Sequence, residues 1–329
     1  MPFHPLGADL LTTLVFLPTL GALLLALVPG ESKAAARAVG VVTSILTFAV
    51  SVVMLVRYDP TASGIEGFAI DRPWLPRFGI RYQLGVDGLA LALVLLTTLL
   101  TVSVLLVACG QKIDKLKGYV ASFLVLETGM VGSLVALDMI LFYVFWEVML
   151  IPMYFIIGIW GGKRRIYATM KFFLFTMAGS LLMFIAILYT AGVHSRTTGL
   201  LSFSVVDWAR ASASGAWSLA PGVEALLFGA FALAFLVKVP LWPLHTWLPD
   251  AHVEAPTGGS VILAGVLLKL GTYGLLRFAW PLFPNAAARY GPFLAVLALV
   301  GVVYGAWVAA AQKDMKKLVA YSSVSHLAL

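Results

Sequence analysis

Long apolar segments separated by short polar links run along the whole chain. A helix needs about 20 apolar residues to cross the hydrocarbon core of a bilayer. The links carry Gly, Pro and charged residues, which mark turns between helices. The pattern predicts an all-α polytopic membrane protein with about ten transmembrane helices, at residues 9–29, 37–56, 84–109, 118–136, 139–160, 167–191, 222–251, 257–281, 290–311 and from 315 onward.

Three stretches depart from this pattern. Residues 57–84 are too polar to cross and alternate loosely in polarity, which predicts an extramembrane loop with a surface hairpin. The Ser-, Thr- and Ala-rich residues 195–217 predict a second extramembrane loop. The tenth segment stops at Leu329 after about 14 residues, short of a full crossing. We therefore expect a C-terminally truncated chain, a fragment of a longer protein.

The composition agrees with a membrane protein. The 329 residues are 61% hydrophobic and 11% charged, whereas soluble domains carry about 25% charged residues. The single cysteine excludes a disulfide within the chain and any four-cysteine metal or iron–sulfur site. The sequence contains no P-loop, dinucleotide fingerprint, HExxH or nucleophile elbow. We therefore expect no cofactor and no metal on this chain, and a membrane-embedded hydrolase has little support.

The distribution of Lys and Arg predicts the orientation. One set of alternate loops holds eleven of them and the other set holds eight, four of which belong to a single long segment where the rule is weaker. The loops GGKRR and QKDMKK are therefore predicted inside, with the N-terminus outside. The N-terminal region offers Asp9 but no basic residue before its apolar run, so we expect a retained first helix rather than a signal peptide.

Four ionisable residues lie in the middle of apolar segments: Glu127, Glu147, Lys238 and Lys269. A charge at a helix centre costs roughly 2.5 to 3.5 kcal/mol on insertion scales. Two acids and two bases at that depth predict charged partners, water and a role in moving protons. The alternatives are a structural ion pair that only fixes helix packing, and acids that extend to the membrane surface.

Positions along the chain place these charges at comparable depths. Glu127 lies ten residues before position 137 and Glu147 ten after it, so both are about 15 Å from the predicted turn. Lys238 lies fifteen residues before position 253 and Lys269 sixteen after it. Antiparallel neighbours are therefore expected to carry their carboxylates at matching depth near the membrane midplane, and their ammonium groups likewise.

The seventh segment contains the sequence Val239-Pro240-Leu241-Trp242-Pro243. Proline lacks the N–H that an α-helix needs, so the helix is predicted to break just after Lys238. Broken membrane helices commonly mark ion sites in transporters. A nearby carboxylate raises the proton affinity of a lysine and burial lowers it. Movement of the carboxylate would therefore switch the proton on Lys238.

Histidine is the natural proton relay near neutral pH. His245 lies beyond the predicted break and His326 lies about twelve residues into the last segment, so both are candidates for a relay with the two lysines. His252 is placed near the membrane edge, where an interfacial role is the alternative. Lys171 lies about one turn inside the sixth segment and either faces the interior or extends to the inner surface.

Two long segments resemble the antiporter-like subunits of respiratory complex I, the NADH–quinone oxidoreductase. They are FWEVMLIPMYFIIGIWGGKRRIYATMKFFLFTMAGSLLM and KVPLWPLHTWLPDAHVEAPTGGSVILAGVLLKLGTYGLLRFAWP. The resemblance covers essentially the whole chain. It implies an antiporter-like inverted-repeat fold with a broken seventh helix, divided into an N-terminal three-helix segment 1–116, a first five-helix repeat 117–281 that forms a proton half-channel, and an incomplete second repeat 282–329.

The same resemblance implies a function. Glu147 and Lys238 would form a charge-coupled pair, Lys269, His245 and His326 would lie on a central hydrophilic axis, and Glu127 would match a second acid. The chain would be a proton-translocating membrane-arm subunit of the translocase, a multi-pass protein of the bacterial inner membrane. NADH, flavin, iron–sulfur clusters and quinone are expected on partner subunits, with neighbouring antiporter-like subunits and lipid as contacts and no nucleic acid.

Two other functions remain open. A subunit of an Mrp-type cation/proton antiporter or of a membrane-bound hydrogenase module would share the same charged helices, and a dependence of transport on sodium would favour it. A purely structural membrane scaffold would be made more stable by neutralising the buried charges, with no change in function.

Overall fold

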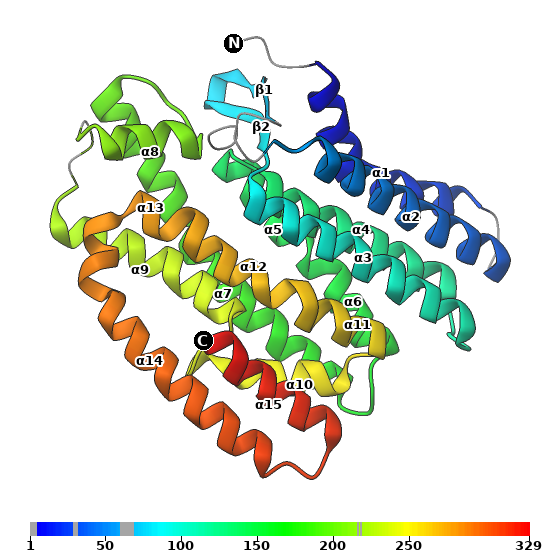
Figure 1. Ribbon diagram of the computed structural model, residues 1–329. Coiled ribbons are helices and arrows are strands. Elements are labelled where there is room, and N and C mark those ends of the chain that lie inside the picture. Colours follow the sequence, from blue (N-terminus) through cyan, green and yellow to red (C-terminus); the bar gives the residue numbers. More distant parts are fainter. Residues whose placement is uncertain (1–4, 29–31, 60–68, 216, 218) are drawn as a thin grey trace. The chain divides into compact units, whose positions relative to one another are not determined.

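A computed structural model describes residues 5–28, 32–59, 69–215, 217 and 219–329, with the backbone alone for residues 5–9. Nearly all of this part of the chain is helical (Figure 1). By length and composition, nine helical segments in it could cross a membrane, which confirms a polytopic all-α protein: Leu10–Leu27 within α1 (Pro5–Leu27), α2 (Lys33–Arg57), α3 (Gly88–Gly110), α4 (Leu116–Val135), Met139–Trp160, α7 (Arg165–Thr198), α9 (Pro221–Lys238), Thr257–Leu282 and α14 (Pro284–Ala310).

The tenth predicted segment forms the helix α15 (Met315–Ala328), which has 14 residues. At 1.5 Å per residue it is about 21 Å long, less than the roughly 30 Å of a hydrocarbon core. It is therefore not among the nine candidate spans of the described residues. The predicted loop 195–217 also differs from expectation, because it contains the last turn of α7 and a short helix α8 (Val205–Ala213).

Contacts between residues group the chain into two units. Unit 1 comprises Met1–Trp74, Arg81–Trp160 and Pro256–Val266, and unit 2 comprises Leu75–Ile80, Gly161–Ala255 and Leu267–Leu329. The boundary falls inside the predicted repeat 117–281, so the units do not follow the predicted segments. An internal repeat concerns symmetry rather than contact, and the division into 1–116, 117–281 and 282–329 remains a prediction.

Small residues set the packing in unit 1. A Cβ atom on Gly21 of α1 would meet the Thr43 side chain of α2, and one on Gly132 of α4 would overlap the ring of Phe145. Helices approach closely in membranes where a side chain is missing. Partly buried hydroxyl groups then join neighbouring helices, as between Thr19 and Thr128, whose Oγ1 atoms are 2.8 Å apart.

A β-hairpin follows α2, as the sequence predicts, although residues 60–68 of the predicted loop lie outside the described part. Strand β1 (Ala69–Leu75) pairs with β2 (Ile80–Gly85) through a turn that contains Gly79 at φ 67°. Strand β2 also pairs with the link between α4 and α5 (Met139–Val148): the Leu137 N–H donates to the Gln83 carbonyl at 2.9 Å, and Leu84 forms a bridge with Ala136.

The seventh span in unit 2 is interrupted where the prolines predict. Helix α9 ends at Lys238, residues 239–243 are not helical, and the chain continues through a short 3₁₀ turn into α10 (Trp247–Glu254). The backbone near the break finds other partners. The indole Nε1 of Trp247 donates to the Val237 carbonyl at 2.8 Å, and the Leu241 N–H donates to the Leu236 carbonyl at 3.1 Å. Non-helical backbone at membrane depth requires such replacements.

The close packing of α4 on α5 predicts a large effect of a small substitution. Gly132→Ala adds a methyl group that overlaps the Phe145 ring, so we expect a loss of about 1–3 kcal/mol in the free energy of unfolding. Thermal unfolding of the purified chain in detergent measures this. Gly192→Ala in α7 is the matched control, because a Cβ there meets no other atom within 4 Å, and it should be neutral or stabilising. Equal destabilisation by both substitutions would contradict the packing argument.

Candidate functional site

The two mid-span acids of unit 1 lie on an antiparallel helix pair. Glu127 is in α4 and fully buried, and Glu147 is near the end of α5 and half-buried. Among the described residues, neither carboxyl oxygen of Glu127 nor Oε1 of Glu147 has a hydrogen-bond partner. A charge in such surroundings costs several kcal/mol.

Close contacts between α4 and α5 show which residues of the two helices lie at the same level, and so refine the predicted depths of the two acids. Gly129 faces Met149 and Gly132 faces Phe145 across the α4–α5 contact. Glu127 therefore lies opposite residues 150–151, about one helical turn, or roughly 5 Å, from the level of Glu147. The two carboxylates are at similar rather than identical depth.

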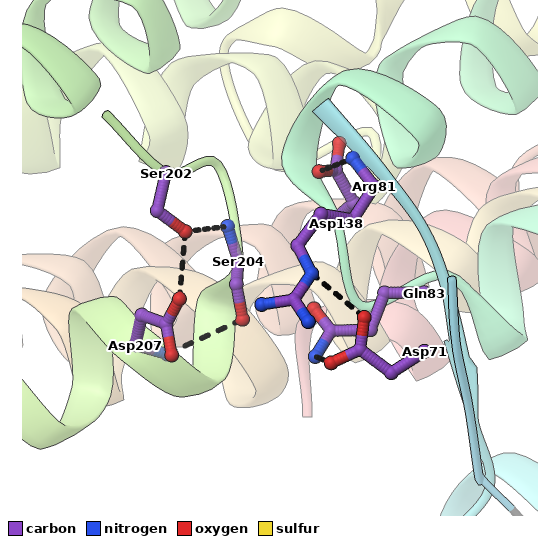
Figure 2. A network of polar contacts seen from close by, with 7 residues as sticks. All are labelled: Asp71, Arg81, Gln83, Asp138, Ser202, Ser204 and Asp207. Carbon is purple, nitrogen blue, oxygen red and sulfur yellow. Dashed lines mark hydrogen bonds and ion pairs between the residues drawn. The ribbon is translucent and has the colours of Figure 1, made fainter. Parts of the chain in front are cut away.

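The link between α4 and α5 is held by the carboxylate of Asp138 (Figure 2). This buried side chain accepts hydrogen bonds from the backbone N–H of Arg81 at 2.9 Å, of Ile140 at 2.9 Å and of Leu141 at 3.1 Å. The Arg81 guanidinium in turn pairs with Asp71 at 2.7 Å. Asp138 thus caps the helix that carries Glu147 and joins it to the β-hairpin. The sequence analysis did not identify this role, although Asp directly before a helix is a capping signal.

Burial raises the pKa of the Asp138 carboxyl, while its backbone donors and the Arg81 charge act in the opposite direction. A folded-state pKa above the unfolded value means that the folded protein binds the proton more tightly. The contribution of this group to stability is therefore present at low pH and is lost as the pH rises through the folded-state pKa.

The helix that carries Glu147 has a discontinuity that the sequence analysis missed. Helix α5 ends at Val148, and α6 (Leu150–Trp160) begins two residues later. Pro152 supplies the signal, because its missing N–H leaves the carbonyl group four residues earlier without a helical partner. The interruption is slight, because Met149 keeps helical backbone angles and its N–H donates to the Phe145 carbonyl at 3.3 Å.

Lys238 is the last residue of α9 and is only 2% exposed. The C-terminus of a helix carries a partial negative charge, which favours a cation. Gly179 of α7 lets that helix approach the same end of α9, because its Cβ position is 3.3 Å from the Cα of Ala234 and 3.4 Å from Val237. The sequence places the lysine at the break, and the packing buries it there.

Lys269 lies in α12 (Leu268–Gly274), between two π-helical turns, Leu263–Leu267 and Leu275–Ala279. Such turns are rare and occur frequently at functional sites, and the sequence analysis did not predict them. Gly271 packs against the backbone of Phe235 and Val239. Half-buried Lys269 and buried Lys238 thus flank one close contact between α12 and the end of α9.

The histidines have different surroundings. His245 is 4% exposed, and its ring meets that of Tyr304 in α14 with centroids 5.1 Å apart. His252 is also buried, in α10, and its predicted place near the membrane edge remains a prediction. His326 is exposed on α15, where neighbouring Ser325 donates to the Val302 carbonyl at 2.9 Å.

The predicted site residues divide between the two units. Glu127 and Glu147 lie in unit 1, and Lys238, Lys269 and His245 lie in unit 2. The predicted pairing of Glu147 with Lys238 involves one residue from each unit, and it remains a prediction. So does the place of His326 on the hydrophilic axis.

Unit 2 contains an ion pair formed by Lys171, a residue whose direction the sequence left open. The Lys171 ammonium group is 2.7 Å from Asp250 Oδ2, with side chains that are 21% and 32% exposed. Lys171 therefore pairs with the second half of the broken helix. In the same described ranges, no three His, Cys, Asp or Glu side chains are arranged to hold a metal ion.

Comparison with known proteins agrees with these features. The family model described as "NADH:quinone oxidoreductase/Mrp antiporter, TM" matches residues 136–329, more than half of the chain. The chain belongs to this family. The matched region begins just before Asp138 and includes Glu147, Lys238, Lys269, His245 and His326.

Relatives within the NADH:quinone oxidoreductase/Mrp antiporter family extend the similarity to the N-terminal helices. The chain is 48% identical over 326 residues to NADH-quinone oxidoreductase subunit M of Rhodobacter capsulatus, covering 97% of this chain and 62% of that protein. It is similar to a chain of respiratory complex I from Thermus thermophilus, with a TM-score of 0.83 and 34% identity, covering 97% and 63%. The chain thus spans slightly less than two thirds of these relatives.

A likeness to the Mrp complex from Dietzia shows the shared fold. Its TM-score is 0.76 at 24% identity, covering 96% of this chain and 33% of that one. The predicted resemblance to the antiporter-like subunits is confirmed, and the protein is a multi-pass membrane protein of this family.

Removal of the Asp138 side chain should weaken the support of α5. Asp138→Ala leaves three N–H groups without their acceptor, one of them buried and two partly buried, so we expect a loss of about 1–3 kcal/mol in the free energy of unfolding. Ser32→Ala, which removes an exposed cap with a longer hydrogen bond of 3.3 Å, should cost less. Thermal unfolding in detergent compares the two variants. An equal or smaller loss of stability in Asp138→Ala would argue against a role of Asp138 in supporting α5.

Because the pKa of Asp138 is raised in the folded protein, its contribution to stability depends on pH. The stability of the wild type relative to Asp138→Asn should increase as the pH falls from neutrality toward about 4, the ordinary pKa of an aspartate, because only the aspartate gains a proton on folding. Unfolding midpoints measured at several pH values test this expectation. A constant difference, or one that shrinks on acidification, would contradict it.

Proposed function

We propose that this chain forms part of subunit M of a bacterial proton-pumping NADH:quinone oxidoreductase. The observation that carries the proposal is Lys238, buried at the end of an interrupted membrane helix in a chain that is 48% identical to a protein of that name. A buried lysine at a helix break has a proton affinity that depends on nearby charge. The chain would lie in the inner membrane with its N-terminus outside, next to other membrane subunits.

The proposed mechanism is electrostatic. At 4 Å and an effective dielectric constant of about 20, a carboxylate and an ammonium group attract by about 4 kcal/mol. Loss of that attraction changes the proton affinity of the lysine by about three powers of ten. When Glu147 moves away, Lys238 would release its proton toward Lys269, and the return of Glu147 would favour reprotonation.

The remaining residues have supporting roles in this proposal. Glu127, one turn from the level of Glu147, would hold a proton or a charge beside it. His245 would relay protons to Lys238, and His326 would extend the path beyond Lys269. Quinone reduction, together with the binding of NADH, flavin and iron–sulfur clusters, would belong to partner subunits, which change the charge around Glu147.

Substitution of the proposed pair tests the function. In the assembled oxidoreductase, Glu147→Ala and Lys238→Ala should each reduce the initial rate of proton pumping by about tenfold or more, as expected when a proton-transfer group is removed. Pumping is measured in sealed vesicles during NADH oxidation, and assembly is checked on native gels. Lys112→Ala, at an exposed loop position, is the control. Normal pumping by both variants would refute the assignment.

Exchange of sodium for potassium distinguishes the Mrp-type alternative. The likeness to the Mrp complex is below 25% identity and shows the fold alone. Transport by the wild type that requires sodium would favour a cation/proton antiporter, and pumping at the same rate without sodium would favour the oxidoreductase.

A further inference from the structure

The break in the seventh span changes the partners of two carbonyl groups in the last turn of α9. In an unbroken helix the Leu236 carbonyl would accept a hydrogen bond from residue 240, and the Val237 carbonyl from residue 241. Pro240 has no N–H to donate, and the Leu241 N–H donates to the Leu236 carbonyl instead, at 3.1 Å. The Val237 carbonyl is thus left to a side chain.

A tryptophan side chain takes this place. The indole Nε1 of Trp247, at the start of α10, donates to the Val237 carbonyl at 2.8 Å, and the hydrogen bond is buried. The indole ring packs against that of Phe172 in α7, with centroids 5.4 Å apart. Loss of the indole N–H would therefore leave a buried carbonyl group without its donor.

Helix α10 is fixed to α7 beyond the indole. The Asp250 carboxylate pairs with the Lys171 ammonium group at 2.7 Å. One helical turn later, the Glu254 carboxylate accepts a hydrogen bond of 2.9 Å from the Arg164 backbone N–H, directly before α7. A short helix that is tied to its neighbour at two points presents its side chains in a defined direction, so the indole is held ready for the Val237 carbonyl.

The carbonyl that the indole binds belongs to the residue before Lys238. The negative end of a helix dipole resides on carbonyl groups that lack a donor. A donor on the Val237 carbonyl reduces that negative charge next to the buried lysine. A bare carbonyl, or a water molecule that entered to satisfy it, would favour the ammonium form. Without the indole N–H, Lys238 would therefore hold its proton more tightly.

We propose that Trp247 is a positioning residue for proton transfer, whose indole N–H binds the Val237 carbonyl and thereby keeps Lys238 able to release its proton. This inference rests on the proposed function, in which Lys238 loses and regains a proton. The indole itself neither gains nor loses a proton, and no electrons or covalent groups move.

Other ionisable groups of unit 2 lie near the break and are not altered by a change at position 247. Gly179, Gly271 and Gly301 mark the levels at which α7, α12 and α14 pack against residues 234–242. The ionisable side chains of the turn before Trp247 and of these elements, within about two helical turns of those levels, are Lys171, His245, Lys269, Tyr273, Arg277 and Tyr304. A changed pH dependence in a Trp247 variant therefore reports on the indole.

Trp247→Phe tests the inference, because it removes the N–H and keeps an aromatic ring beside Phe172. Initial rates of proton pumping are measured in sealed vesicles of the assembled oxidoreductase at several pH values, and each rate is divided by the wild-type rate at the same pH. We expect a ratio of about one tenth near pH 6 that rises toward one near pH 9. A lysine that holds its proton about tenfold more tightly releases it at a pH about one unit higher.

Trp208→Phe is the matched control. Trp208 is buried in α8, and its indole Nε1 donates to the Ser202 carbonyl at 2.8 Å. The same substitution thus removes an equally short hydrogen bond outside the candidate spans. It should lower the unfolding temperature about as much as Trp247→Phe but pump like the wild type at every pH. If Trp247→Phe fails to assemble, benzothienylalanine at position 247, which replaces the N–H by sulfur in a ring of the same size, decides the question.

The outcomes separate this inference from the proposed function. If Lys238→Ala loses pumping while the ratio for Trp247→Phe is constant or falls as the pH rises, the indole has only a structural role and the inference is wrong. An equal rise with pH in Trp208→Phe would also overturn it. Normal pumping by Lys238→Ala refutes the proposed function and this inference with it. Loss of pumping in Lys238→Ala, together with a rising ratio in Trp247→Phe alone, supports both.

Discussion

Unit 2 depends on one constraint: backbone groups inside a membrane cannot remain without hydrogen-bond partners. The prolines after Lys238 end α9 there, and the freed groups must find other partners. Trp247 and Leu241 supply two of them by donating to carbonyl groups of α9. The Trp247 indole thus ties the start of α10 to the last turn of α9, which ends at Lys238, and the C-terminal end of a helix favours a cation. The break therefore both creates the site and determines what surrounds it.

Unit 1 shows a different solution for two acids. A tight link joins α4 to α5, and three N–H groups near that link converge on the Asp138 carboxylate. Because glycines let the two helices pack closely, the register of Glu127 and Glu147 is fixed to within about a turn. Asp138 lies outside the candidate spans, whereas Glu127 and Glu147 lie within them. Their depth is thus set by the contacts of Asp138 and of the glycines, which have no part in the proposed proton transfer.

Much of the fold followed from local pattern. Apolar length predicted the nine spans, because a helix that crosses lipid needs an uninterrupted run of such residues. The two prolines predicted the end of α9 at the right residue. The discontinuity after Glu147 had a signal in Pro152 that was not used. The π-helical turns around Lys269 had no recognised signal, since one added residue per turn depends on how neighbouring helices pack.

The sequence by itself determined which residues lie in membrane helices, where ionisable groups interrupt them and where the backbone must break. These properties depend on composition and spacing along one helix. Only the tertiary structure decided the pairing of Lys171 with Asp250, 79 residues away, and the contact of Asp138 with Arg81, 57 residues away. The physical reason is that a short ion pair or hydrogen bond requires two backbones to be placed within a few ångströms, and this placement results from the packing of whole helices.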